Sequence, residues 1–217
     1  MDLEAFIITN GRSTFEYALK ALQQQTFKFK ITILRDMKWV DALNECLNRS
    51  SASHFIRCDD DFVLHPRAIE FMWNRYQTVS KLKTIMLVAK LWEDWTSRIA
   101  GGVKIYNAEF VKDIGGFKVN HLGKVDKKFR EQVQETNYRM DGCKKSVVGL
   151  HTCGSWEEQL RYETLWSKLA DHAYKKTTHN DMKKYKKPLD EQFAMRTKFV
   201  EKINKRYRTF FHEFLKK

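Results

Sequence analysis

The sequence predicts an α/β fold with a mainly parallel central sheet flanked by helices, followed by a basic helical C-terminal extension. Short apolar runs rich in β-branched residues alternate with segments of helical periodicity, which is typical of βαβ units. One such run leads directly into three aspartates at residues 59–61, and lysine and arginine concentrate toward the C-terminus. We therefore expect an α/β domain over residues 1–165 and the basic extension over residues 166–217.

The first part of the chain reads as alternating strands and helices. Residues 5–9 (AFIIT) form an apolar run closed by Asn-Gly, which predicts a buried strand and then a loop. The segments after it are predicted by the spacing of their apolar residues or by β-branched composition. They are a helix at 14–25, a strand at 29–34, a helix at 39–47, a strand at 55–58, a helix at 67–76 with Pro66 in its first turn, and a strand at 84–89.

The second part of the chain is less regular. The pairs Gly101-Gly102 and Gly115-Gly116 predict turns. Beyond about residue 166 the chain reads as helical and basic, and Pro188 divides it. Between Phe199 and Phe214 the apolar residues form one stripe at helical spacing. This helix either docks on its own domain or offers an amphipathic surface to a membrane or to nucleic acid.

Positive charge is the strongest signal in the composition. The chain has 40 Lys and Arg against 27 Asp and Glu, a net charge of +13, and residues 168–217 carry 15 basic and 6 acidic residues, or +9. Such a field attracts anionic polymers or anionic lipid. The N-terminal MDLEAFIIT lacks the basic region of a secretory signal, and no run reaches the roughly 18–20 apolar residues of a membrane span. We expect a cytoplasmic protein without a transmembrane segment. The sequence does not indicate its oligomeric state.

The three aspartates stand at the carboxyl end of a predicted strand, where open α/β sheets bind their ligands. Side chains alternate along a strand, so Asp59 and Asp61 should point to one side and Asp60 to the other. Hard oxygen ligands of this kind suit Mg²⁺ or Mn²⁺, which also bind phosphates. The pattern predicts a site for a metal and a diphosphate, and the alternative is a solvated acidic turn.

Other segments, in a fixed order along the chain, accompany the aspartates. Over roughly residues 4–155 the chain resembles the family 2 glycosyltransferases of the GT-A fold, a Rossmann-like α/β fold, and the aspartates match the DXD motif of that family. The remaining matches are Thr9-Asn10-Gly11-Arg12 after the first strand, Gln25-Thr26 near the end of the first helix, Pro66, DIGGF (113–117), Asp126, ETNYRM (135–140) and VVGLH (147–151).

The resemblance implies a hexosyl- or pentosyltransferase that uses a nucleotide diphosphate sugar, with a UDP-sugar as the expected donor and Mn²⁺ or Mg²⁺ as cofactor. It implies a metal site of Asp59, Asp61 and His151, with Asp59 bridging to ribose or to a metal-bound water. Asp126 would deprotonate the acceptor hydroxyl, whose pKa lies far above 7, so inversion at the anomeric carbon is expected. The residues that would line the nucleotide pocket are Thr9, Arg12, Asp36, Asp59 and Asp60.

The chain departs from the family pattern at two places. Only Asp36 remains of the segment that recognises the nucleotide base, and Val125 replaces the glutamate expected before Asp126. Each assignment also has a structural alternative: Asp36 as a solvated turn residue, Asp126 as a helix N-cap, and His151 as a hydrogen-bonded histidine at a strand end. Three tryptophans either stack on a sugar or base or pack in the protein, namely Trp92, Trp95 and Trp156.

Four functions are compatible with these patterns. The favoured acceptor is DNA, through the hydroxyl of a hydroxymethylated base, which would have to be reachable in a groove or flipped out. Transfer to a lipid-linked or cell-surface glycan is the first alternative. A metal-dependent nuclease would need further acidic ligands, and a nucleic-acid-binding module would leave the aspartates unexplained. The lysines expected to contact DNA phosphates are Lys183, Lys184, Lys186 and Lys187.

Overall fold

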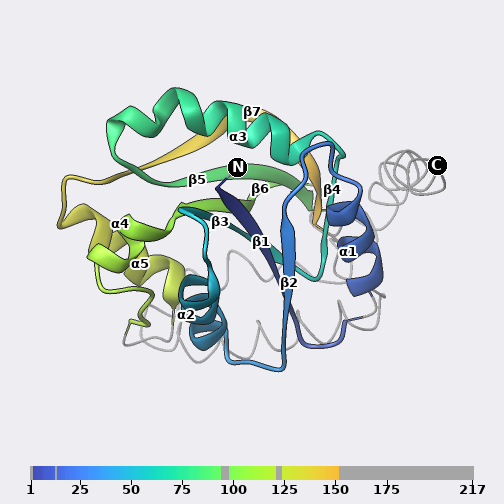
Figure 1. Ribbon diagram of the computed structural model, residues 1–217, viewed down its shortest axis with the longest axis horizontal. Coiled ribbons are helices and arrows are strands. Elements are labelled where there is room, and N and C mark those ends of the chain that lie inside the picture. Colours follow the sequence, from blue (N-terminus) through green and yellow to red (C-terminus); the bar gives the residue numbers. More distant parts are fainter. Residues whose placement is uncertain (1, 13, 94–97, 121–123, 152–217) are drawn as a thin grey trace, which may run out of the picture. The chain divides into compact units, whose positions relative to one another are not determined.

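The computed structural model describes residues 2–12, 14–93, 98–120 and 124–151 (Figure 1). The chain divides into two compact units, one of residues 1–92 and 99–151 and the other of residues 93–98 and 152–217. The predicted boundary at residue 165, the basic extension and its lysine cluster lie outside the described residues. None of the helices in the described part of the chain is long and apolar enough to cross a membrane.

Strands and helices alternate through the first part of the chain, as predicted. The strands are β1 (Leu3–Thr9), β2 (Lys30–Arg35), β3 (His54–Asp59), β4 (Phe62–Leu64), β5 (Thr84–Glu93), β6 (Arg98–Asn107) and β7 (Arg139–His151). The helices are α1 (Phe15–Gln23), α2 (Trp39–Arg49), α3 (Ala68–Val79), α4 (Ala108–Asp113) and α5 (Val125–Gln134), with a 3₁₀ helix, η1 (Ser80–Leu82), after α3.

The seven described strands form one sheet in the order β2-β1-β3-β6-β5-β7-β4. β1 pairs in parallel with both β2 and β3, whereas β6 pairs antiparallel with β3 and β4 pairs antiparallel with β7. All residues of β1 are buried, because a parallel strand between two others is covered on both faces. The predicted α/β fold is confirmed, and its antiparallel strands fall mostly in the part of the chain where the sequence pattern loosens.

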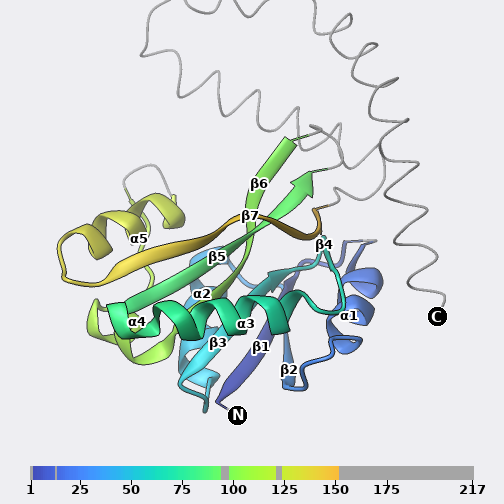
Figure 2. The same ribbon diagram turned by 90° about the horizontal axis from the view of Figure 1, so that it is seen from above.

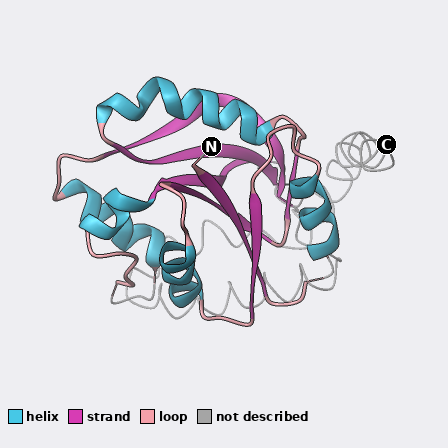
Figure 3. Ribbon diagram, viewed as in Figure 1, coloured by secondary structure: helices cyan, strands magenta, loops and turns pink. Residues whose placement is uncertain are grey.

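Helices cover both faces of the sheet, and each face has its own apolar core (Figures 1 and 3). In Figure 2, α3 lies across one face of the sheet. On that face α1 and α3 pack against alternate residues of β1 and β3, and the core includes Ile7, Leu22, Ile56 and Met72. On the other face α2, α4 and α5 cover the remaining strand residues, and the core includes Phe6, Leu43, Phe55, Val111 and Phe129.

Two local predictions are wrong. Gly101 and Gly102 lie inside β6 rather than in a turn, and a Cβ at Gly102 would overlap the side chain of Leu91. The glycine pair therefore marks close packing within the sheet. Pro66 precedes α3 rather than lying in its first turn, because the helix begins at Ala68. The other pair, Gly115-Gly116, does form the predicted turn, with φ angles of +80° and +72°.

The short strand β4 is held by the last residues of β7. Phe62 pairs with His151, and Leu64 pairs with Gly149. A Cβ built on Gly149 would lie 2.5 Å from the carbonyl oxygen of Val63 and 2.9 Å from the Cα of Leu64. Residue 149 must therefore be glycine for the two strands to approach, and this approach places His151 beside the turn that contains the aspartates.

Replacing Gly149 by alanine is expected to lower the free energy of unfolding by about 1–3 kcal/mol, the usual cost of forcing extra atoms into packed structure. The added methyl meets backbone atoms, which have little freedom to move. Gly142→Ala is a matched control in the same strand, because a Cβ there would meet Val88 only at 3.5 Å. Urea unfolding of the two variants measures the difference, and equal stability would contradict the close approach.

Candidate active site

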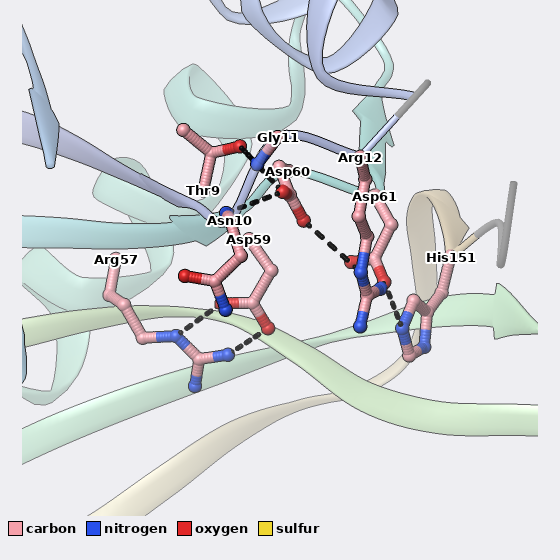
Figure 4. Close-up of polar contacts among 9 residues, drawn as sticks. All are labelled: Thr9, Asn10, Gly11, Arg12, Arg57, Asp59, Asp60, Asp61 and His151. Carbon is pink, nitrogen blue, oxygen red and sulfur yellow. Dashed lines mark hydrogen bonds and ion pairs between the residues drawn. The ribbon is translucent and has the colours of Figure 1, made fainter. Parts of the chain in front are cut away.

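Predicted site residues from β1, β3 and β7 gather where β1 and β3 end (Figure 4). β3 stops at Asp59, and Asp60 and Asp61 form the turn into β4. The expected alternation therefore does not extend over all three aspartates: Asp59 bonds to Arg57, whereas Arg12 lies against both Asp60 and Asp61. The alternative of a solvated acidic turn is wrong for the last two, because Asp60 and Asp61 are only 5% and 3% exposed.

Asp60 ties the end of β3 to the end of β1. The Thr9 hydroxyl donates a 2.6 Å hydrogen bond to Asp60 Oδ2, and the Asn10 N–H donates to the same oxygen at 3.2 Å. The Gly11 N–H donates to Thr9 Oγ1 at 2.9 Å. These bonds fix the loop that follows β1, so Thr9 and Asp60, both buried, determine where Arg12 stands.

Arg12, Asp61 and His151 converge on one carboxylate oxygen. The Arg12 guanidinium donates to Asp61 Oδ2 through its terminal nitrogen, and its Nε lies 3.7 Å from Asp60 Oδ1. His151 Nε2 lies 3.4 Å from Asp61 Oδ2, and the His151 ring meets the Phe62 ring edge-on with centroids 4.9 Å apart. The structure thus brings Asp61 and His151 together, two of the three residues predicted to share a metal.

The other oxygen of Asp61 has a different environment. Asp61 Oδ1 is buried and has no hydrogen-bond partner among the residues that the structure describes. A buried carboxylate oxygen without a donor costs free energy unless a cation or a donor reaches it. The turn after β3 therefore presents an acceptor oxygen that the described side chains leave unused.

Asp59, the third predicted metal residue, is bonded to a buried arginine. Arg57 Nε donates to Asp59 Oδ1 at 3.0 Å, and its terminal nitrogen donates to Asp59 Oδ2. The guanidinium also lies over the Trp39 ring, 4.4 Å from its centroid. Burial raises the pKa of Asp59 above its ordinary value and the nearby Asp61 carboxylate adds to the rise, while Arg57 opposes it. The Asp59 carboxylate thus turns away from His151 and toward the sheet (Figure 4).

Asp126 lies in the first turn of α5 and bonds to a lysine of the sheet. Lys104 Nζ donates to Asp126 Oδ1 at 2.8 Å, and the side chains are 11% and 60% exposed. Burial alone would raise the pKa of Asp126, but Lys104, Arg57 and Arg130 outweigh it and hold the pKa below its ordinary value. The N-cap alternative for Asp126 is wrong, because Lys124 occupies the N-cap position of α5.

The Gly-Gly-Phe turn anchors α5, and with it Asp126. Asn44 of α2 accepts a hydrogen bond from the Phe117 N–H at 2.9 Å and donates one to the Phe117 carbonyl at 3.0 Å. Gln132 of α5 donates to the carbonyls of Ile114 and Gly116 at 2.9 Å and 3.1 Å. The turn is therefore clamped between two helices, and the motif that resembles the family pattern serves to hold the helix that carries Asp126.

Asp36 and the tryptophans complete the predicted set. Asp36 is exposed in a turn after β2, with φ at +54°, and its N–H donates to the Thr9 carbonyl at 3.1 Å. Asp36 therefore borders the loop that carries Arg12. It is also an exposed turn residue, as the alternative interpretation of Asp36 predicted. Trp95 and Trp156 lie outside the described residues, as does the side chain of Trp92.

Within residues 2–12, 14–93, 98–120 and 124–151, no three carboxylate, imidazole or thiolate side chains form a group that could hold a metal by themselves. The polar groups that are present divide into two neighbouring sets. One set is the loop after β1 with Asp60, Asp61 and His151, and the other joins Asp59 and Asp126 through buried cations.

Sequence reasoning missed Arg57, Lys104 and Trp39. Arg57 is 5% exposed and Lys104 is 9% exposed, and they are directly opposite each other in the antiparallel pair of β3 and β6. The available signal was a basic residue inside an otherwise apolar strand, in FIRC and in GGVKIY. A buried charge of this kind needs an anionic partner, and Asp59 stands two residues after Arg57.

No family model matches the sequence, and no curated protein matches it. Solved structures match in fold. The mannosyltransferase PcManGT from Pyrobaculum calidifontis, in complex with GDP-Man and Mn²⁺, superposes with a TM-score of 0.57 at 10% identity, covering 74% of this chain and 59% of that one. S. aureus TarS 1-349 in complex with UDP-GlcNAc superposes with a TM-score of 0.53 at 11% identity, covering 74% and 61%.

These similarities concern the fold. The chain spans about three fifths of the length of those two proteins. The predicted fold class, a GT-A-like α/β fold, is the one that this chain shares with these glycosyltransferases.

Proposed function

We propose that this protein is a glycosyltransferase that takes a hexosyl or pentosyl group from a nucleotide diphosphate sugar and transfers it to an acceptor hydroxyl. The observation that supports the proposal best is the meeting of Arg12, Asp61 and His151 at the carboxyl ends of the central strands. Open α/β sheets bind ligands at this edge. The two structures with the same fold hold GDP-Man and UDP-GlcNAc, and a UDP-sugar is the donor that we propose here.

The residues at the turn fit a divalent cation, Mn²⁺ or Mg²⁺. Asp61 Oδ1 is buried without a partner in the described part of the chain, and Asp61 and His151 supply oxygen and nitrogen ligands from two strands. Ions of this class bind through one or two protein ligands together with phosphates, so Asp61 and His151 would hold it. Asp59, the third predicted ligand, would reach the ion only after its carboxylate leaves Arg57. Such a cation neutralises negative charge on a leaving diphosphate.

The chain's own residues have three tasks in this proposal. Thr9 and Asp60 hold the loop after β1, and Arg12 on that loop places a guanidinium beside the diphosphate. Asp36, exposed next to the same loop, faces the nucleotide. Asp126 accepts the proton of the attacking hydroxyl and is anionic at neutral pH, because its pKa lies below the ordinary value. A base placed for direct attack on the anomeric carbon gives inversion.

For the acceptor, we propose DNA carrying a hydroxymethylated base. The net charge of +13 supports an anionic acceptor. A lipid-linked or cell-surface glycan is the alternative that an acceptor assay must include. The cytoplasmic location and the phosphate contacts of Lys183, Lys184, Lys186 and Lys187 stay predictions from the sequence.

Incubation of the purified protein with a panel of nucleotide sugars and Mn²⁺ tests the proposal through release of nucleoside diphosphate. Release from at least one donor is expected, with loss of activity in excess chelator and recovery on adding Mn²⁺ or Mg²⁺. Adding hydroxymethylated DNA or a lipid-linked glycan should accelerate release from that donor, and mass spectrometry of each acceptor identifies the product.

Other outcomes assign another function. If no donor is consumed while DNA or RNA is cut in the presence of metal, the protein is a nuclease. If neither reaction occurs and nucleic acid binds with a steep salt dependence, it is a binding module. Full activity in excess chelator would remove the metal from the proposal but leave the transferase.

A further inference from the structure

Two buried cations stand side by side in the set that contains Asp59 and Asp126. Arg57 of β3 and Lys104 of β6 are direct partners across the antiparallel pair, so their side chains leave the same face of the sheet. Arg57 bonds to Asp59, and Lys104 bonds to Asp126 at 2.8 Å. Like charges this close repel each other, and the arrangement persists because each cation has its own carboxylate.

We propose that Lys104 is a positioning residue, which holds the carboxylate of Asp126 in place for proton transfer from the acceptor hydroxyl. The inference rests on the proposed function, since it assigns a role to Lys104 in that reaction. Lys104 itself is buried in the sheet, and its ammonium reaches the first turn of α5. Lys104 bonds to Oδ1, and the Asp126 side chain is 60% exposed, so in this proposal Oδ2 faces the acceptor.

The rigidity of this contact distinguishes it from an ordinary surface ion pair. A surface lysine samples many rotamers, and its ion pairs contribute little. Lys104 is packed into the strand and 9% exposed, so its ammonium has few alternative positions. The helix that bears Asp126 is likewise fixed, through the bonds of Gln132 to the Gly-Gly-Phe turn. Strand and helix together therefore determine where the carboxylate lies.

The charges around Asp126 also set the pH range in which it can act as a base. The cations that face it are Lys104 from β6, Arg57 from β3 and Arg130 from its own helix, and Tyr106 and Asp59 lie in the same field. Burial raises the pKa of Asp126, and Lys104 opposes this effect, so removing Lys104 should raise the pKa of Asp126. A base must be deprotonated to act, so activity is lost as pH falls through its pKa. This loss should begin at a higher pH without Lys104.

The test compares Lys104→Met with Lys104→Arg and with Lys127→Met. Methionine keeps the length of the lysine stem and removes its charge, and arginine restores the charge. Lys127 is next to Asp126 in sequence but pairs with Glu131 at 4.0 Å, so its replacement controls for loss of a nearby charge. Nucleoside diphosphate release from the donor found by the panel is measured from about pH 4 to pH 8, together with donor affinity and thermal unfolding.

The expected result for Lys104→Met is a fall in turnover of about tenfold to a hundredfold, the range associated with a misplaced catalytic group. The acidic limb of its profile of turnover against pH should move to higher pH, while donor affinity stays at the wild-type value. Lys104→Arg should recover part of the turnover and the wild-type limb, and Lys127→Met should behave as wild type. If Lys104→Met does not fold, Lys104→Gln provides the neutral variant, with the same expectations.

Three results would overturn the inference, and they are distinguishable. A wild-type protein that consumes no donor removes the proposed function and, with it, the role of Lys104. An active wild-type protein whose Lys104→Met variant keeps wild-type turnover and an unshifted acidic limb removes the role of Lys104 alone. A loss of turnover without any shift of the limb, and without recovery in Lys104→Arg, would make Lys104 only a structural residue.

Discussion

Asp126→Asn is expected to lower turnover by about 10²- to 10⁴-fold, the usual contribution of a general base. The substitution keeps the shape of the side chain, and the amide oxygen can still accept the bond from Lys104 that Asp126 Oδ1 accepts at 2.8 Å. What is lost is the ability to take a proton. Because Asp126 is bonded to Lys104 of β6, which is not among the residues proposed to hold the donor, donor affinity should remain near the wild-type value.

Single-turnover kinetics with the natural acceptor, beside calorimetric donor binding, measures both quantities. Glu131→Gln is the matched control: it neutralises a carboxylate on the same helix whose partners are Lys127 and Lys128. Turnover of Asp126→Asn within a few-fold of wild type would transfer the role of base to another group. Retention of the anomeric configuration in the product would contradict the inverting mechanism by an independent route.

The second large effect is expected from Asp61→Asn. Asp61 is 3% exposed and its Oδ2 meets both Arg12 and His151, so the variant loses the negative charge on which the cluster converges. Substituting a residue that only hydrogen-bonds to a metal ligand already lowers metal affinity about 10- to 100-fold. We therefore expect Mn²⁺ affinity to fall by more than about 100-fold and turnover to fall with it. His151→Ala should show the same direction with a smaller loss.

Mn²⁺ binding can be followed by electron paramagnetic resonance without any substrate. Asp141→Asn is the matched control, because Asp141 is also a poorly exposed aspartate held by arginines, Arg75 and Arg139, at the other end of β7. It is expected to bind Mn²⁺ as the wild type does. Unchanged Mn²⁺ affinity in Asp61→Asn would mean that the cation does not bind at Asp61.

The parts of the fold that could be predicted from the sequence are those governed by local patterns. β1 and β3 follow from apolar runs, because a strand buried on both faces leaves a plain apolar signature. The partly exposed β2 follows from its β-branched residues, and the helices between these strands follow from helical spacing. Gly101-Gly102 was misread because a glycine pair is ambiguous: the same residues serve a turn or a close approach inside a sheet, and only the packing of Leu91 decides between them.

The site could be predicted where its residues lie at strand ends. It could not be predicted where the contacts depend on which strands pair in the sheet. Asp61 and His151 were placed in one cluster by motif order, and the structure brings them to 3.4 Å. The pairing of Arg57 with Lys104 was missed because it depends on the register between β3 and β6, which no local sequence pattern encodes. The direction of the Asp59 side chain follows from a local pair instead, since Arg57 stands two residues earlier in the same strand and bonds to its carboxylate.

The pairing of β4 with β7 links the completeness of this site to the order in which the chain folds. Asp61 lies just before β4, whereas His151 is the last residue of β7, and a three-residue ladder joins the two strands. Contacts between residues so distant in sequence form only after a long loop has closed. During synthesis the aspartates emerge well before His151, and Arg12 is already present to neutralise them. A nascent chain can therefore build its parallel strands before His151 reaches the aspartates, and the proposed metal site would be complete only once β7 has docked.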